Sequence, residues 1–368
     1  MAPFAAVLRG EAVPWAAFGL TGTGFLETCR AEGLAGLVHH RVHQSDAGRD
    51  WPERVRAALG DEARRGEAVS LLRDGELNTV LRALASAGVR PLILKGAALA
   101  HTHYPAPASR PRIDTDILIP SRSVGATRQV LLDCGYTAPN FCGGDLFCQF
   151  PMQRSDRFGF VHKLDVHWKI STQPVFADVL SYPEMAAASI EVPALGPHAR
   201  APHSVHGLLL ACVHPAMHHR NVESLLWQFD IHLLAASLSD MELGEFAELA
   251  RRRRVSTICA EQLDATRRRF GTSIPEAVRV SLAGGGDEPS AAYLRANRQW
   301  TDDLVASLRG LRRWPERVRF LRDVAFPSPR YMRSAYDLPR SPLATLMLPL
   351  VYAHRLAAGG WKILAGQK

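Results

Sequence analysis

Apolar and polar positions along the chain predict a short α/β segment between longer helical stretches. Residues 76–88, ELNTVLRALASAG, carry apolar side chains at helical spacing and end at Gly88, a residue typical of helix C-termini. The apolar run from Leu92 to Leu94 is strand-like, and Lys95 and Gly96 then turn the chain into a segment rich in alanine and leucine. The predicted order is therefore helix, strand, tight turn and helix.

A second run of strand and helix patterns follows a proline-rich loop. Residues 112–120, RIDTDILIP, predict a strand that ends at Pro120, and residues 121–136 predict a helix that closes at Gly135. The stretch from about Phe141 to Lys169 is expected to form strands, the last of them in HKLDVHWKI. Beyond Ser171 the pattern becomes helical and stays helical to the end of the chain.

These patterns predict an α+β fold in which a mixed sheet with helices is flanked by further helical regions. A chain of 368 residues is longer than one hydrophobic core usually serves, so we expect two or three packed subdomains. The expected division is a helical region at 1–75, an α/β core at 76–185, a helical domain at 186–310 and a helical extension at 311–368.

Composition indicates a globular protein in a reducing, cytoplasmic setting. Hydrophobic residues make up 47% of the chain and charged residues 22%, and the six cysteines form no CxxC pair. The first residues lack a basic leader and are interrupted by Arg9 and Glu11, which argues against a signal peptide. The apolar segment 343–353, LATLMLPLVYA, is too short to span a bilayer. A buried helix is the favoured interpretation of it, and a helix lying on a membrane surface is the alternative.

The net charge of +8 is typical of proteins that handle polyanions such as nucleotide phosphates, nucleic acid or acidic lipid. Much of the excess is arginine in the C-terminal half, and arginine-rich helix faces are commonly just solvated. The charge therefore agrees with phosphate chemistry without requiring it.

Three aspartates are the candidate metal ligands. Asp114 and Asp116 are two apart on a predicted strand, so their carboxylates project from one face, where their repulsion calls for a cation. Such pairs also occur at exposed strand ends, where water solvates them. A third acid, Asp165, lies on another predicted strand, on the same face as Lys163 and His167. Three carboxylates on neighbouring strands can hold two Mg²⁺ ions, with Mn²⁺ as the alternative.

The turn at Gly96 supplies a candidate phosphate site. A strand that passes through a glycine into a helix exposes backbone N–H groups and the positive end of the helix dipole to an anion. Lys95 adds a positive charge next to this turn. Taken alone, a Lys-Gly turn is common.

The motifs LKGAALA, RPRIDTDILIP and LDVHW together resemble the nucleotidyltransferase superfamily with the DNA polymerase β-like fold. More narrowly, they are similar to an uncharacterised bacterial nucleotidyltransferase family with an LKG turn, an arginine four residues before a DxD strand, and a later LDxHW. A more distant resemblance is to abortive-infection and toxin-type nucleotidyltransferases. The motifs cover residues 90–170, and a looser likeness extends through the helical part.

The resemblance implies catalytic, metal-binding roles for Asp114, Asp116 and Asp165, and a nucleotide-binding role for Lys95, Gly96, Ala97 and Arg110. The chain departs from many superfamily members in two places. Ala97 stands where serine or glycine is common, which removes a hydroxyl but keeps the backbone N–H group, and Thr115 stands where an aliphatic residue is common.

The expected function is Mg²⁺-dependent transfer of a nucleoside monophosphate from an NTP to a hydroxyl of an acceptor, which is a small molecule, a peptide or protein, or tRNA. Two alternatives remain: a weakly active nucleotide-binding module of a toxin–antitoxin or regulatory system, and an RNA-binding protein. His167 is a candidate for positioning the acceptor or taking its proton. His214, His218 and His219 favour a structural or pocket role over zinc binding.

Overall fold

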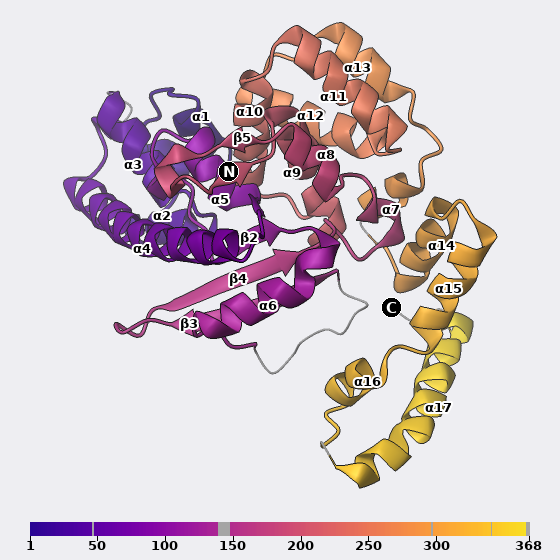
Figure 1. Cartoon of the computed structure of the whole chain (residues 1–368). Helices are drawn as coiled ribbons and strands as arrows, with labels where there is room; N and C mark the ends of the chain where they lie inside the picture. Colours follow the sequence, from indigo (N-terminus) through magenta and orange to yellow (C-terminus); the bar gives the residue numbers. More distant parts are fainter. Residues whose placement is uncertain (46–47, 139–147, 296, 340, 366–368) are drawn as a thin grey trace.

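The computed structural model describes residues 1–45, 48–138, 148–295, 297–339 and 341–365. A small mixed sheet lies between groups of helices contributed by both ends of the chain (Figure 1). The α+β class, with helical regions before and after the core, is therefore confirmed. The boundaries expected at 75, 185 and 310 stay predictions.

The central sheet has four strands in the order β1, β2, β4, β3. Their bounds are Leu92–Ile93 for β1, Thr115–Leu118 for β2, Gln149–Ser155 for β3 and Val161–His167 for β4. β1 and β3 are antiparallel to their neighbours, whereas β2 and β4 are parallel. A parallel pair needs a crossover connection, which here includes α6 (Val124–Asp133). In the β2–β4 pair, Asp116 lies directly opposite Asp165.

One face of the sheet packs on a hydrophobic cluster. The cluster includes Ile117 and Val166 from the strands, and Leu81 from α4 (Glu53–Ser86). Successive side chains of a strand point to opposite faces, so Asp116 and Asp165, which precede Ile117 and Val166, project from the other face. The sequence had predicted this alternation, with Val166 in the core and Asp165 opposite.

The helices before and after the sheet share a second hydrophobic cluster. Phe25 comes from the N-terminal helices, and Leu209, Phe229 and Phe246 come from those that follow the sheet. The N-terminal elements are α1 (Ala2–Leu8), α2 (Gly22–Ala31), α3 (Ala35–Gln44) and the first half of α4. The later ones are α9 (Ser204–His218), α10 (Leu225–Ala236), α11 (Asp240–Arg252), α12 (Ser256–Phe270) and α13 (Glu276–Ala283).

The remaining elements are short or lie near the C-terminus. They are α5 (Lys95–Thr102), α7 (Pro174–Ala177), α8 (Tyr182–Ala187), α14 (Trp300–Gly310), α15 (Trp314–Ala325), α16 (Pro329–Ala335), α17 (Pro342–Ala365), and the two-stranded sheet of β5 (Ile190–Glu191) and β6 (Arg200–Ala201). Single-turn 3-10 helices cover Trp15–Phe18, Pro107–Ser109, Ser121–Ser123 and Pro193–Leu195, and a longer one covers Pro289–Leu294.

Three expectations are corrected. The chain is not wholly helical after Ser171, because β5 and β6 pair there through two residues each. The helix expected from residue 76 begins at Glu53 and runs without a break to Ser86. Segment 343–353 lies in α17 and is not a buried helix, since Leu346 and Leu350 are exposed. The start of the strand region expected from Phe141 lies outside the described residues.

Within the described part of the chain, no helix combines the length and the apolar character needed to cross a membrane.

Candidate active site

The candidate site is a cavity of about 580 Å³ between the polar face of the sheet and the helices α9 and α10. Asp116 from β2, and Asp165 and His167 from β4, line it together with Asp114, which immediately precedes β2. The turn at the start of α5 lines the same cavity. The fold thus brings the three predicted acids and the predicted phosphate turn into one pocket.

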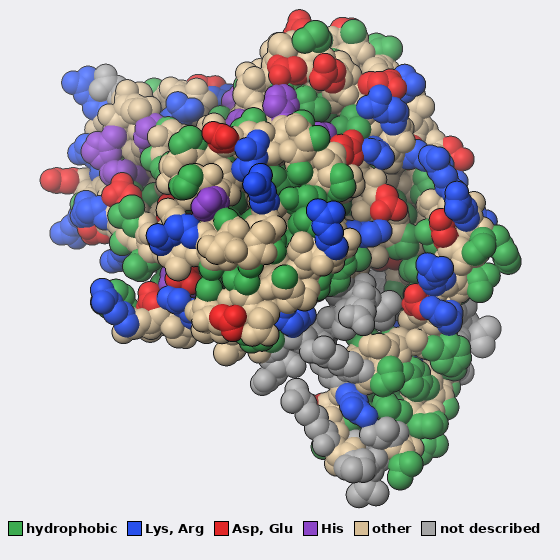
Figure 2. Space-filling view, in the orientation of Figure 1, with side chains coloured by type: hydrophobic (Ala, Val, Ile, Leu, Met, Phe, Trp, Pro, Cys, Tyr) green, Lys and Arg blue, Asp and Glu red, His purple; other side chains and the backbone are tan. Residues whose placement is uncertain are grey.

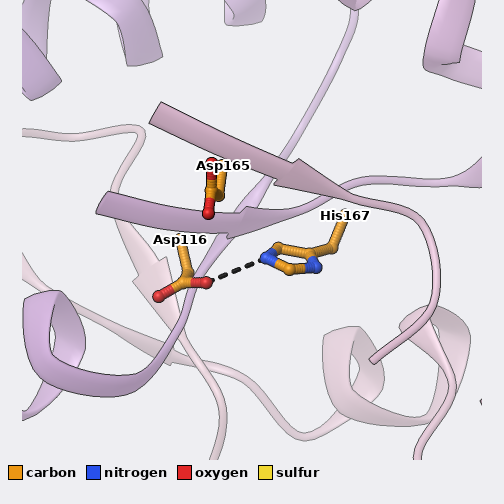
Figure 3. A group of neighbouring side chains, drawn as sticks. All are labelled: Asp116, Asp165 and His167. Carbon is orange, nitrogen blue, oxygen red and sulfur yellow. Dashed lines mark hydrogen bonds and ion pairs between the residues drawn. The ribbon is translucent and has the colours of Figure 1, made fainter. Parts of the chain in front are cut away.

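Asp116, Asp165 and His167 form the tightest group of potential metal ligands. One ligand atom from each lies within 4.8 Å of the other two, and Figure 3 shows their side chains facing one another beside the paired strands. His167 Nε2 lies 2.8 Å from Asp116 Oδ1. Asp114 lines the cavity beside this group without belonging to it. Among the described residues, this is the one group with metal-binding spacing.

The three acids differ in how their charges are balanced. Burial alone would raise the pKa of Asp116, but the Lys95 ammonium, 2.8 Å from its Oδ1, and the hydrogen bond from His167 hold that pKa well below its ordinary value. Burial and the charge of Asp116 raise the pKa of Asp114. The pKa of Asp165 is raised by burial and, to a smaller extent, by the charges of Asp116 and Asp114. The negative charges of Asp114 and Asp165 are therefore only weakly balanced by positive groups of the protein.

This donor set fits a divalent cation. Carboxylate oxygens are the ligands that Mg²⁺ prefers, and a neutral imidazole can complete such a site for Mn²⁺. A cation between the strands would offset the repulsion that raises the pKa values of Asp114 and Asp165. The residues present are therefore those that a metal-dependent site requires.

The turn between β1 and α5 has an unusual backbone. Lys95, the first residue of α5, has a φ of 51°, in the left-handed region that side chains other than glycine seldom adopt. Conformations of this kind cluster at functional sites, because the surrounding structure must hold them. Here the conformation accompanies the contact of the Lys95 side chain with Asp116. Gly96 and Ala97 follow, both buried.

Arg110 lies against this turn and leaves little room for a side chain at Gly96. A Cβ atom at Gly96 would come within 3.1 Å of Arg110 Nη1 and 3.2 Å of its Cζ. Arg110 itself is buried and donates two hydrogen bonds to Asp230, from Nε to Oδ1 at 2.8 Å and from Nη2 to Oδ2 at 2.7 Å. Tyr104 donates to Asp230 Oδ1 at 2.7 Å, and Arg110 Nη1 donates to the Pro111 carbonyl. The pair therefore ties α10 to the start of α5.

The guanidinium of Arg110 is already paired within the protein. Whether it also binds phosphate is not tested by these contacts, so that expected role stays a prediction. The partner of this guanidinium is Asp230, 120 positions away, which the local sequence around either residue does not indicate.

Sequence reasoning missed the contacts that hold the loop before Asp114. Arg112 Nη2 donates to Asp74 Oδ1 at 2.7 Å, and His101 Nε2 lies 3.2 Å from the same oxygen. Arg73 donates to the Arg112 carbonyl. Asp74 and Arg73 lie on α4, so only the packing of α4 against this loop could have identified them.

Histidines and a tryptophan form the wall of the cavity on α9 and α10. His214, His218, His219 and Trp227 all line it. The His219 and Trp227 rings lie 4.4 Å apart, and the His214 and Trp227 rings 5.3 Å. Burial lowers the pKa of His218 to about 4 and that of His214 well below its ordinary value. These two imidazoles are therefore neutral near pH 7, and the wall carries little charge.

Comparison with known protein families identifies a match. A family model described as an uncharacterised nucleotidyltransferase matches residues 23–271, which is more than half of the chain and includes every site residue named above. None of the curated proteins matches the sequence. The resemblance found in the motifs is thus confirmed: the chain belongs to this uncharacterised nucleotidyltransferase family.

Proposed function

We propose that the protein is a Mg²⁺-dependent enzyme that transfers a nucleoside monophosphate from an NTP to a hydroxyl group of an acceptor and releases pyrophosphate. The observation that carries the proposal is the in-register pair of Asp116 and Asp165, which faces the α5 turn across one cavity. Family membership supports a nucleotidyltransferase, and the geometry supports the participation of a metal.

Asp114, Asp116 and Asp165 would hold the ions, with His167 beside them. Bound divalent ions lower the pKa of an attacking hydroxyl and neutralise charge on the phosphates and the leaving group. The protein's own part is to hold the acids in place. The parallel pairing of β2 with β4 fixes Asp116 opposite Asp165, and His167 Nε2 donates a hydrogen bond to the Asp116 carboxylate.

The turn at the start of α5 is the proposed binding site for the triphosphate. The first N–H groups of a helix have no partner within the helix, so those of α5 are available to an anion. Lys95 contributes a positive charge next to the acids. Ala97 supplies no hydroxyl, but its methyl group belongs to the hydrophobic cluster under the sheet, and its N–H group is the same as that of serine.

The wall formed by His214, His218 and Trp227 is the proposed acceptor side. Its imidazoles are neutral near pH 7, so they can donate hydrogen bonds to hydroxyl groups, or accept them, without attracting a second polyanion. His214 Nδ1 is buried and has no hydrogen-bond partner in the described part of the molecule. A hydroxyl-bearing small molecule, a peptide side chain or a tRNA end remain the candidate acceptors.

The proposal is tested by incubating the full chain with each α-labelled NTP, Mg²⁺ and a cell extract, and by following both label transfer and pyrophosphate release. We expect one or more macromolecular or small-molecule species to acquire label with wild type and none with Asp165→Asn. Asp178→Asn is the matched control, because Asp178 is an exposed acid that pairs with Lys169 away from the cavity. Equal label transfer by wild type and Asp165→Asn would refute the assignment. Metal-dependent NTP binding by wild type without any transfer would favour a binding module.

A further inference from the structure

The net positive charge of this protein comes entirely from its C-terminal end. Residues 311–368 contain 11 lysines and arginines and 3 acids, a net charge of +8, which equals that of the whole chain. The first 310 residues, with the nucleotidyltransferase site, therefore carry 33 basic and 33 acidic residues. A charge so unevenly distributed predicts a surface for a polyanion that is separate from the nucleotide site.

The described part of this end, residues 311–365, is here called the C-terminal arm. It comprises α15, α16 and α17, and it extends away from the sheet and the main group of helices (Figure 1). Within the arm, α16 packs against α17. The Tyr352 hydroxyl donates to the Pro327 carbonyl, and Arg355 Nη2 donates to the Val324 carbonyl at 3.3 Å. The arm is therefore held together by its own contacts.

Large apolar side chains are exposed on the arm in helical stripes. Trp314, Val318 and Leu321 follow one face of α15, and α15 has no buried residue. On α17, Leu346 and Leu350 are one turn apart and are 75% and 70% exposed. Figure 2 shows hydrophobic side chains gathered over the arm, with lysine and arginine side chains close by. Apolar stripes of this size on a soluble surface indicate an interaction site.

The second face of α17 is apolar as well. Leu348, on the side opposite Leu346 and Leu350, is buried, as is Met332 of α16. A helix that is hydrophobic on both faces is normally covered on both. The inner face of α17 is covered by the arm itself, so its outer face requires a partner outside the described chain.

We propose that the C-terminal arm binds to the surface of a membrane that contains anionic lipids. Exposed tryptophan and leucine beside clustered arginine are the features by which interfacial helices enter the headgroup region and attract acidic lipid. Nucleic acid would match the charge but would leave the leucines in water. A second copy of the arm would cover the leucines but would bring two charges of +8 together. The absence of a spanning helix among the described residues agrees with surface binding.

The experiment is sedimentation of the full-length protein with two kinds of vesicle, phosphatidylcholine alone and phosphatidylcholine mixed with phosphatidylserine. We expect binding to the mixed vesicles, at least tenfold weaker binding to the neutral ones, and a further loss at high salt. The double variant Leu346→Ser and Leu350→Ser should lose at least tenfold in binding. Both side chains are exposed, so the fold should survive, which its melting temperature checks.

The matched control is Met241→Ser, which removes an equally exposed apolar side chain from α11, outside the arm. It should bind vesicles as wild type does. A charge variant, Arg312→Gln with Arg319→Gln, should weaken binding to the mixed vesicles and flatten its dependence on salt.

Several results would overturn the proposal. They are no vesicle binding by wild type, equal binding to both kinds of vesicle, or unchanged binding by the leucine variant. Salt-sensitive RNA binding that ignores the leucine variant would instead assign the arm to nucleic acid, and self-association lost in the leucine variant would assign it to a second copy. None of these outcomes depends on NTP transfer, so the arm and the nucleotide site are tested separately.

Discussion

Replacing Asp116 or Asp165 by asparagine should have opposite effects on the stability of the metal-free protein, although the two acids lie opposite each other in the sheet. Asparagine keeps nearly the same shape and removes one negative charge. Asp165 faces other carboxylates and forms no ion pair with a described residue, whereas Asp116 contacts both the Lys95 ammonium and the His167 imidazole. From sequence alone, relief of repulsion would have been expected of Asp116→Asn.

The magnitude follows from the distances. Two unit charges within 4.8 Å of each other repel by at least about 3.5 kcal/mol at an effective dielectric constant of about 20. The Lys95 charge offsets part of this repulsion, so Asp165→Asn should gain about 1–2 kcal/mol, or roughly 1–3 °C in melting temperature for a chain of 368 residues. Asp116→Asn should lose about 1–3 kcal/mol, because it leaves the Lys95 ammonium and the His167 ring without their charged partner.

The pH dependence of the stability also tests whether each replacement stabilises or destabilises the protein. The pKa of Asp165 is raised in the folded state, so its charge lowers stability at neutral pH and this cost disappears as the pH falls through the raised pKa. The gain of Asp165→Asn over wild type should therefore shrink in acid. The pKa of Asp116 is lowered, so its contribution is complete above 3.8, the ordinary value, and is lost only as the pH falls through the lower folded pKa.

The assay is thermal unfolding in EDTA at several pH values, followed by the same measurement with added Mg²⁺. Wild type should gain stability with Mg²⁺, and both variants should lose most of this gain, together with NTP transfer. Asp178→Asn, at an exposed ion pair, should behave as wild type. If both site variants shift in the same direction in EDTA, or if Asp165→Asn responds fully to Mg²⁺, the proposed electrostatics of the site are wrong.

Three further predictions concern the surroundings of the acids. Asp230→Ala should lower the free energy of unfolding by about 3–5 kcal/mol, because it leaves the buried Arg110 unpaired, and the double replacement Arg110→Met with Asp230→Leu should recover most of that loss in urea titrations. Gly96→Ala should cost about 1–3 kcal/mol through overlap with Arg110 and should weaken NTP binding, whereas unchanged NTP affinity would show that the turn does not hold the phosphates. His218→Gln should raise the KM for the acceptor and leave the pH profile above about pH 5 unaltered, because the pKa of His218 is about 4 and its ring is already neutral there; a lost limb near neutral pH would contradict this.

The elements that hold the acids could be predicted from the sequence because their signals are local. Alternating apolar residues in RIDTDILIP and HKLDVHW fix which side chains share a face of a strand, and Gly96 marks a turn. Both strands form, and Asp116 and Asp165 lie on the same face of one sheet. That these strands are neighbours was inferred from the need of three acids to share metal ions, since periodicity within one strand carries no information about its partner.

Other features depend on contacts between distant residues and could not be predicted. The Arg110–Asp230 pair joins positions 120 apart, and nothing near either residue distinguishes it from other arginines and aspartates. β5 and β6 are two residues long, too short for a period to appear. The exposure of Leu346 could not be predicted either, because an apolar run has the same sequence pattern whether or not other parts of the protein cover the helix.

The 34-residue helix α4 belongs to both hydrophobic clusters, and this makes the two parts of the molecule thermodynamically dependent on each other. Val55 and Leu59 near its start pack among the flanking helices, and Leu77 and Leu84 near its end pack under the sheet. Unfolding either cluster removes packing from one end of a continuous helix and favours fraying toward the other. We therefore expect a fragment that begins at residue 76 to form the sheet poorly by itself, since it would lack the N-terminal two thirds of the helix on which the sheet rests.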